Sequence, residues 1–181
     1  MDRVLPLIET GHVHFGENKV QEAELKWKEV KQRHSNIKLH MVGKLQTNKV
    51  KTALKIFDYI HSLDNMKLAE KISYEQKKIN KKPKLFIQIN IGNELQKSGI
   101  AIEKLDEFYQ NCIQLDLDVI GTMCLPPENQ DPDIYFSKMK NLNDNIKLNE
   151  LSMGMSHDYL TAIKYSSSYL RIGSKIFGAR S

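Results

Sequence analysis

The chain has 181 residues, of which 40% are hydrophobic and 27% charged, and it carries a formal net charge of +5 at pH 7. This composition is typical of a globular protein, and the length suits a single domain over residues 1–181. No apolar run approaches the roughly 20 residues that cross a bilayer. The N-terminal MDRVLPLIETG lacks the long apolar segment of a secretion signal. The sequence therefore predicts a cytoplasmic protein that is neither secreted nor membrane-bound.

Lysine supplies most of the positive charge, with runs at Lys77-Lys78 and Lys81-Lys82. Such runs are typical of solvated helix ends and loops. They lack the aromatics interleaved with arginine that would favour a nucleic-acid surface, whereas an anionic small ligand is compatible with the charge. The two cysteines, Cys112 and Cys124, have no metal-ligand spacing and predict no disulfide framework.

Strand and helix patterns alternate along the whole chain. A helix tail over residues 2–9 is followed by Gly11, a residue common just past helix ends. Strands are expected at 12–17, 39–43, 57–64, 85–91 and 117–124, and near residues 150 and 169. Helices are expected at 19–33, 65–79, 102–115 and 133–146. Two more are expected, one that follows the loop at 44–49 and runs through residue 56, and one between the last two strands. This order predicts a parallel α/β fold: a (β/α)8 TIM-type barrel with seven strands, in which the first βα unit is missing.

The C-terminal stretch from Leu148 to Ser181 contains two short glycine-centred turns, Ser152–Ser156 and Arg171–Ser174. Each follows a strand pattern, and a helix-like segment separates them. In α/β barrels the loops after the last two strands frequently bind phosphate, and serine hydroxyls with glycine N–H groups suit that ligand. Two ordinary turns between strands and helices are an equally open interpretation.

Other candidate residues lie at expected strand ends. Asn18 follows the first strand, where it could face a ligand, cap the next helix, or do both. Arg171 follows the last strand, where its guanidinium could meet a ligand or form a structural ion pair. His40 and His61 lie within strands and are expected to be buried and hydrogen-bonded. No zinc motif, nucleophile elbow, phosphate-binding loop of NTPases or dinucleotide fingerprint occurs.

Seven blocks of the sequence together resemble one family, the pyridoxal phosphate homeostasis proteins, whose barrel is similar to the N-terminal domain of alanine racemase. In chain order the blocks are Phe15-Gly16-Glu17-Asn18, His40-Met41-Val42-Gly43-Lys44-Leu45-Gln46-Thr47-Asn48-Lys49, Gln88-Ile89-Asn90-Ile91, Lys97-Ser98-Gly99, Gly121-Thr122-Met123, Leu151-Ser152-Met153-Gly154-Met155-Ser156, and Arg171-Ile172-Gly173-Ser174-Lys175-Ile176-Phe177-Gly178-Ala179-Arg180. The resemblance covers nearly the whole chain.

The resemblance implies a barrel that binds pyridoxal 5′-phosphate (PLP) without known turnover, and that buffers the cofactor and delivers it to PLP-dependent apoenzymes. It implies that the Ser152–Ser156 turn, including Gly154 and Met155, holds the phosphate together with Gly173 and Ser174. It further implies that Arg171 faces the pyridine nitrogen and that Asn18 lies beside the ring. A monomer is expected, with no metal, nucleic acid or membrane as partner.

One departure from the family pattern concerns the lysine that bonds PLP covalently. The family carries it at the end of the first barrel strand, upstream of Phe-Gly-Glu-Asn, and this sequence begins within the intervening helix. Lys44 also sits at a strand end and could substitute for that lysine, although the neighbouring family motif places Lys44 elsewhere. The expectation is that this chain binds PLP weakly or not at all, without the covalent bond, and that adding the upstream unit restores binding.

Two other functions are open alternatives. The first is a racemase- or decarboxylase-like enzyme on the same barrel, which would need a further β domain and a second catalytic residue. Racemisation of an amino acid would favour it. The second is a basic RNA-binding module, which rests on charge alone and would require salt-dependent binding of single-stranded RNA.

Overall fold

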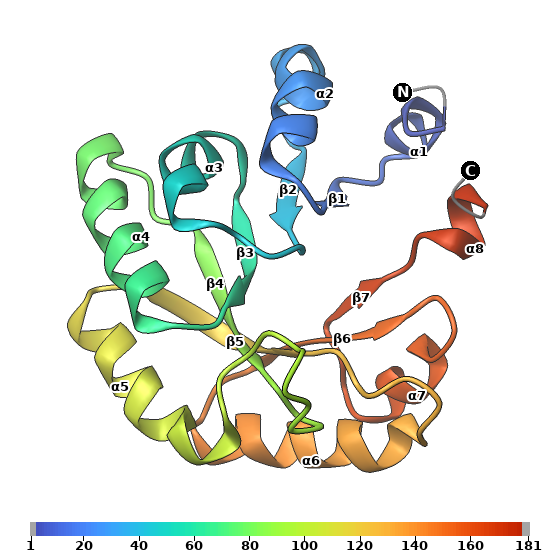
Figure 1. The fold of residues 1–181 in the computed structure, drawn as a ribbon. Helices are drawn as coiled ribbons and strands as arrows, with labels where there is room; N and C mark the ends of the chain where they lie inside the picture. The colour runs from blue at the N-terminus through green and yellow to red at the C-terminus, as the bar shows by residue number, and fades with distance from the viewer. Residues whose placement is uncertain (1–2, 179–181) are drawn as a thin grey trace.

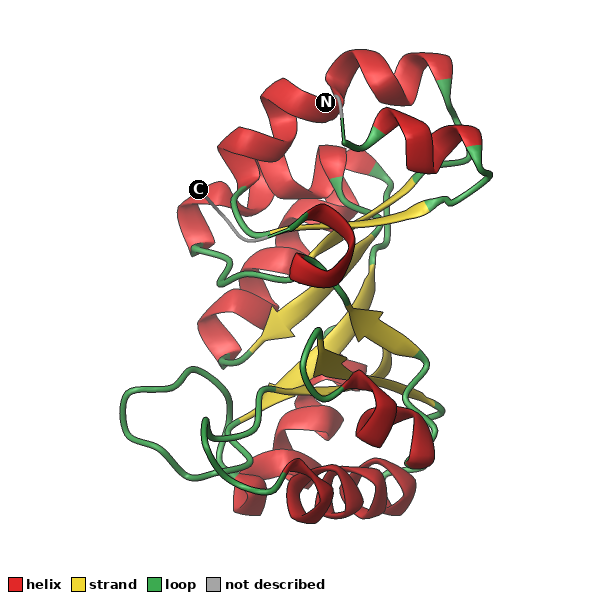
Figure 2. Cartoon of the chain, turned by 90° about the vertical axis from the view of Figure 1, so that its right-hand side faces the viewer, coloured by secondary structure: helices red, strands yellow, loops and turns green. Residues whose placement is uncertain are grey.

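The computed structural model describes residues 3–178 and consists of one curved parallel sheet with helices on its outer face (Figures 1 and 2). Its seven strands are hydrogen-bonded in sequence order. They are β1 (His14–Glu17), β2 (Lys38–Met41), β3 (Tyr59–Leu63), β4 (Lys84–Ile89), β5 (Asp118–Cys124), β6 (Glu150–Met155) and β7 (Tyr169–Arg171). The expected seven-stranded barrel architecture is confirmed.

The helices alternate with the strands, as the sequence predicts. They are α1 (Leu5–Glu9), α2 (Val20–Arg33), α3 (Val50–Ile56), α4 (Met66–Ile79), α5 (Leu105–Gln114), α6 (Pro132–Asn145), α7 (Tyr159–Lys164) and α8 (Ser174–Phe177), with 3-10 turns at Thr47–Lys49 and Ile102–Lys104. The expected first residue of the N-terminal helix, Asp2, lies outside the described residues, as do Ala179 and Arg180 of the last sequence block. None of the helices between residues 3 and 178 is long and apolar enough to span a bilayer.

The two faces of the sheet carry different side chains because successive residues of a strand point to opposite sides. On β4, Leu85, Ile87 and Ile89 join the large apolar core between sheet and helices. Phe86 points the other way, into a smaller cluster with Tyr59 and Met123 inside the barrel. All of these side chains are buried, so β4 carries buried apolar residues on both faces, as a central parallel strand does.

The barrel is nearly closed. Within residues 3–178, β1 pairs only with β2, and β7 pairs only with β6. Outside the strands, the N- and C-terminal helices α1 and α8 come together at this opening (Figure 1), where Arg3 donates a hydrogen bond to the carbonyl oxygen of Phe177. The helical layer therefore spans the gap between β1 and β7, where, among the described residues, the strands themselves are not paired.

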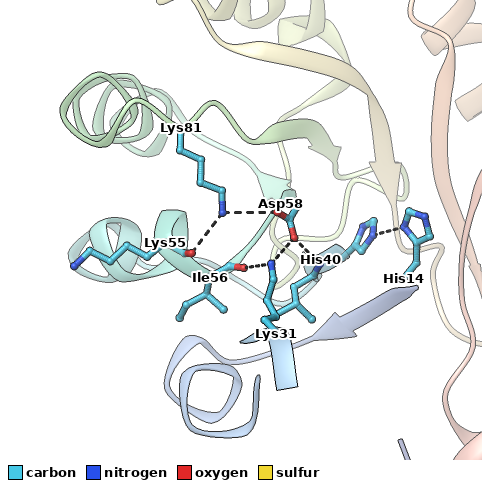
Figure 3. A network of polar contacts seen from close by, with 8 residues as sticks. His14, Lys31, His40, Lys55, Ile56, Asp58 and Lys81 are labelled. Carbon is cyan, nitrogen blue, oxygen red and sulfur yellow. Dashed lines mark hydrogen bonds and ion pairs between the residues drawn. The ribbon is translucent and has the colours of Figure 1, made fainter. Parts of the chain in front are cut away.

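A polar cluster fixes the N-terminal end of β2 and β3 (Figure 3). Asp58 Oδ2 accepts hydrogen bonds from Lys31 Nζ at 2.8 Å and from the backbone N–H of Leu39 at 2.9 Å, and Lys81 Nζ lies 3.8 Å from Asp58 Oδ1. Burial alone raises the pKa of Asp58, but these hydrogen bonds and charges outweigh it, so the pKa lies below the ordinary value of 3.8. Asp58 thus ties α2 and the β2 backbone to β3.

Replacing Asp58 by asparagine should lower the free energy of unfolding by about 1–2 kcal/mol, because partly exposed ion pairs are screened by solvent. The carboxylate is ionised in the folded state at lower pH than in the unfolded chain. Its contribution is therefore present above the ordinary aspartate pKa and is lost as the pH falls through the lower folded value. Urea denaturation at neutral and acidic pH measures both effects. Glu24→Gln, on the exposed face of α2, is the control; equal losses in both variants would contradict the assignment.

Candidate functional site

Arg171, the last residue of β7, projects its guanidinium into the C-terminal end of the barrel. It donates from Nη1 to Ser152 Oγ at 2.7 Å and from Nη2 to the carbonyl oxygen of Cys124 at 2.8 Å. These contacts link β7 to β6 and β5. Burial lowers the pKa of Arg171, and Cys124 and Asp158 act in the opposite direction. Among residues 3–178 a hydroxyl and a backbone carbonyl hold this side chain, and the structural ion pair that the sequence left open does not occur there.

Three histidines continue from Ser152 across the barrel interior. His61 Nδ1 lies 2.8 Å from Ser152 Oγ, His61 Nε2 lies 2.9 Å from His40 Nδ1, and His40 Nε2 lies 2.9 Å from His14 Nδ1. Figure 3 shows the last of these contacts. His40 and His61 are buried, as expected from the sequence, and His14 is exposed. Burial lowers the pKa of His40 to about 3 and that of His61 well below its ordinary value, so both are neutral.

The loops after β6 and β7 meet at one point. The backbone N–H of Gly173 donates to Ser156 Oγ at 3.1 Å. Ser174, the first residue of α8, is exposed next to them. A Cβ built on Gly173 would meet nothing within 4 Å, so this backbone is open to an approaching group. Ser156, Gly173 and Ser174 are thereby brought together, two residues from Arg171.

The expected turn over Ser152–Ser156 is wrong in its extent. Ser152, Met153, Gly154 and Met155 belong to β6, and only Ser156 begins the turn. Ser152 is fully buried and its hydroxyl is taken by Arg171 and His61. Its side chain therefore lies inside the barrel rather than among the exposed loop donors.

Gly154 and Met155 shape the end of β6. Gly154 has φ of +95°, and an added Cβ would lie 2.7 Å from the Cβ of Ala162, so the glycine lets α7 pack directly on the strand. The backbone N–H of Met155 donates to the buried carboxylate of Asp158 at 2.6 Å. Asp158, which the sequence analysis did not single out, thus anchors the turn that leads from β6 into α7.

Asn18 is exposed immediately after β1. The alternative that it caps the next helix is wrong, because α2 begins at Val20 and its N-cap position is Lys19, without a side-chain hydrogen bond. A Cβ on Gly43 would lie 2.3 Å from the carbonyl oxygen of Asn18, so a glycine at 43 permits this close approach. The preceding Glu17 accepts hydrogen bonds from Trp27 Nε1 and Lys26 Nζ, which explains its place in the motif as an anchor for α2.

A cavity of about 350 Å³ opens beside Asn18, at the C-terminal ends of β2, β4 and β5. Its lining residues are Asn18, Val42, Gly43, Lys44, Gln88, Ile89, Asn90, Gln96, Lys97, Ser98 and Leu125. Of the residues expected to form the site, only Asn18 lines it. Arg171 and the Ser156–Gly173 contact lie on the β6 and β7 side of the mouth, so the expected residues divide between two sides of the same barrel end.

Both cysteines are expected to be unreactive in the folded protein. Cys112 and Cys124 are free and fully buried, and burial raises the pKa of each thiol to about 12. Since the thiolate is the reactive form, a thiol-specific chromogenic reagent at neutral pH should label neither residue in the native protein and both in denaturant. Rapid labelling of the native protein would contradict the buried positions of the Cys112 and Cys124 thiols.

Comparison of the sequence with known proteins identifies the family of this chain. The model of the alanine racemase N-terminal domain matches residues 1–181. A pyridoxal phosphate homeostasis protein of Aquifex aeolicus is 38% identical, with 92% of this chain and 76% of that protein aligned. The one from Haemophilus influenzae is 36% identical, with 98% and 79% aligned.

Solved structures agree with the sequence relatives. PipY of Synechococcus elongatus, determined with PLP bound, superposes with a TM-score of 0.89 at 30% identity, over 97% of this chain and 86% of that one. Alanine racemase of Clostridium difficile, at 15% identity and a TM-score of 0.73 over 98% and 48% of the two chains, shares the barrel fold. The chain therefore belongs to the alanine racemase N-terminal domain family, among the pyridoxal phosphate homeostasis proteins.

Proposed function

We propose that this chain binds PLP at the C-terminal mouth of its barrel and acts in PLP homeostasis, without catalytic turnover. The observation that carries the proposal is the contact between Ser156 and Gly173, which joins the loops after β6 and β7 two residues from Arg171. The homologue PipY, which was determined with PLP bound, and the relatives named for PLP homeostasis support it.

The donors at the joined loops fit a phosphate. The Ser156 and Ser174 hydroxyls can donate to phosphate oxygens, and the Gly173 N–H can do so when it exchanges Ser156 Oγ for the ligand; the open space over Gly173 admits the group to the backbone. In this proposal Gly154 and Met155 contribute the backbone shape of the site. Ser152 contributes indirectly, by holding the guanidinium of Arg171, which is a change from the phosphate role that the resemblance implies for it.

Arg171 fits the ring nitrogen of PLP. A guanidinium has five N–H donors, and within residues 3–178 two of its hydrogen bonds are to Ser152 and Cys124. The remaining donors can serve the ring nitrogen, and Asn18 would lie beside the ring. PLP supplies a pyridine ring that withdraws electrons most strongly when its nitrogen is protonated. A permanently charged donor keeps that nitrogen unprotonated, which disfavours racemase- or transaminase-like chemistry and supports a carrier without turnover.

The proposal extends to location and partners. The free, buried cysteines support a cytoplasmic location, since structural disulfides belong to oxidising compartments. We propose a single-domain monomer over residues 1–181 that exchanges PLP with PLP-dependent apoenzymes and has no nucleic-acid or membrane partner.

Equilibrium dialysis with PLP, pyridoxal and inorganic phosphate tests the proposal. PLP should bind at least about tenfold more tightly than pyridoxal, since charge-assisted hydrogen bonds to the phosphate exceed 1.4 kcal/mol. Binding to this chain should be reversible by dialysis, and a version with an upstream strand ending in Ser-Lys should retain PLP. Equal binding of PLP and pyridoxal, or failure of both versions to bind PLP, would overturn the proposal. Racemisation of alanine by the lengthened version would instead favour the enzyme.

A further inference from the structure

The hydrogen-bonded line from Arg171 to His14 has a direction that its chemistry determines. Arg171 can only donate, so Ser152 Oγ accepts from it. Within residues 3–178 the Ser152 hydroxyl hydrogen then has one partner within hydrogen-bond distance, His61 Nδ1, and full burial of Ser152 keeps water away. The reverse arrangement, with His61 donating to Ser152, would leave the serine hydroxyl hydrogen buried without an acceptor. An unmet buried donor costs about 1–3 kcal/mol.

The direction at Ser152 propagates along the whole line. If His61 Nδ1 accepts, neutral His61 carries its hydrogen on Nε2 and donates it to His40 Nδ1. His40 then carries its hydrogen on Nε2 and donates it to His14 Nδ1, and neutral His14 presents Nε2–H to solvent. All three rings therefore take the same tautomer.

This arrangement turns every dipole in the same sense. The lone pair of each ring points towards Arg171 and each N–H points away, so the negative ends face the guanidinium. Within residues 3–178 no carboxylate forms an ion pair with Arg171, and its pKa is lowered first by burial. Asp158 favours the charged form from a distance, but a buried cation without a directly paired carboxylate also requires compensating dipoles. Aligned neutral rings can supply them without cancelling the positive charge.

We propose that His61, His40 and His14 are positioning residues: as Nε2–H tautomers they form a neutral dipolar line that, through Ser152, holds Arg171 charged and aimed at the site. The inference rests on the proposed function where it concerns PLP, and the tautomers themselves do not depend on it. A carboxylate partner would hold Arg171 equally well but would bring a negative charge next to the ligand. The neutral line leaves the full positive charge for an electron pair on the bound ring.

The groups around the line are consistent with neutral rings. His14 is faced by His12, Lys38 and Asp58, of which only Asp58 favours its charged form. His40 is stacked on Tyr59 with ring centroids 4.2 Å apart. His61 is stacked on Phe86 at 4.2 Å, and His40 and Arg171 oppose its protonation. Tyr169 of β7 lies against His14, His40 and His61, with ring centroids 5.6–6.3 Å apart.

Heteronuclear NMR that correlates ring nitrogens with carbon-bound ring protons reads the tautomers directly in the unsubstituted chain. Nδ1 should have the chemical shift of an unprotonated nitrogen in His14, His40 and His61, with and without PLP. Nδ1–H tautomers, or an imidazolium at His61 or His40, would overturn the inference whether or not PLP binds. Loss of PLP binding with the expected tautomers intact would instead count against the proposed function.

Variants of His61 separate positioning from packing. In His61→Leu the line is cut, and PLP affinity should fall about tenfold, the equivalent of one hydrogen bond to a charged group. His61→Gln can accept from Ser152 with its carbonyl and donate to His40 with its amide, so it should recover most of that affinity. His34→Gln, at the end of α2, is the control and should be unchanged. Equal losses in His61→Leu and His61→Gln, with both folded by circular dichroism, would show that His61 only fills space.

Discussion

Replacing Arg171 by leucine is expected to weaken PLP binding by about 10- to 100-fold, which corresponds to the 1.5–3 kcal/mol of a hydrogen bond to a charged group. Arg171 is the one side chain proposed to meet the ring nitrogen, and leucine can donate nothing there. The substitution also strands Ser152 Oγ and the carbonyl oxygen of Cys124, which lose their donors. Equilibrium dialysis against PLP measures the effect.

Two companion variants make this result specific. Arg171→Lys keeps the charge but loses the planar guanidinium that reaches Ser152 and Cys124 together. Its affinity for PLP should therefore lie between that of the unsubstituted chain and that of Arg171→Leu. Arg33→Leu removes an exposed arginine at the end of α2 and should bind PLP as the unsubstituted chain does. Retention of full affinity by Arg171→Leu would show that the ring lies elsewhere in the mouth.

Gly154→Ala should strongly destabilise the folded protein. Its φ of +95° strains any residue with a Cβ, and the new methyl group would lie 2.7 Å from Ala162 Cβ and 3.1 Å from the Cα of Tyr159. Backbone strain and overpacking together should cost about 2–5 kcal/mol of the free energy of unfolding. Urea denaturation followed by circular dichroism measures this difference.

Gly173→Ala is the matched control for stability. At Gly173 φ is −118° and a Cβ would meet nothing within 4 Å, so alanine should change the free energy of unfolding by no more than about 0.5 kcal/mol. Equal unfolding midpoints for the two alanine variants would mean that α7 does not press on β6 at Gly154.

The elements of the fold were predictable because alternation of strand and helix patterns is local. Leu85–Ile91 reads as a central strand from its residue types alone, and Lys84–Ile89 forms β4. The turn expected at Ser152–Ser156 failed for a physical reason. A glycine normally signals a turn, but Gly154 takes positive φ inside a strand, where the pairing of β6 with β7 shifts register and α7 packs closely.

The site was predictable only in part. Arg171 could be singled out because it ends a strand, and the burial of His40 and His61 followed from their strand positions. The line that joins them could not, because its contacts connect residues 26, 21 and 91 positions apart in the chain. Barrel curvature and strand register decide which inward-facing residues of separate strands are in contact. Neither can be predicted from a local sequence pattern.

Because β7 is paired on one side, the local opening of this strand and the binding of a ligand at Arg171 are thermodynamically coupled. Within residues 3–178 this strand has three residues and one neighbour, so it has fewer backbone hydrogen bonds to lose than β4, which is paired on both sides. Segments of this kind open at lower free energy than the global transition. Arg171 lies at the end of β7, and opening the strand separates it from Ser152 and Cys124. A ligand that binds only the closed strand therefore lowers the population of the open strand by mass action, so hydrogen exchange of the β7 amides should slow as the ligand concentration rises.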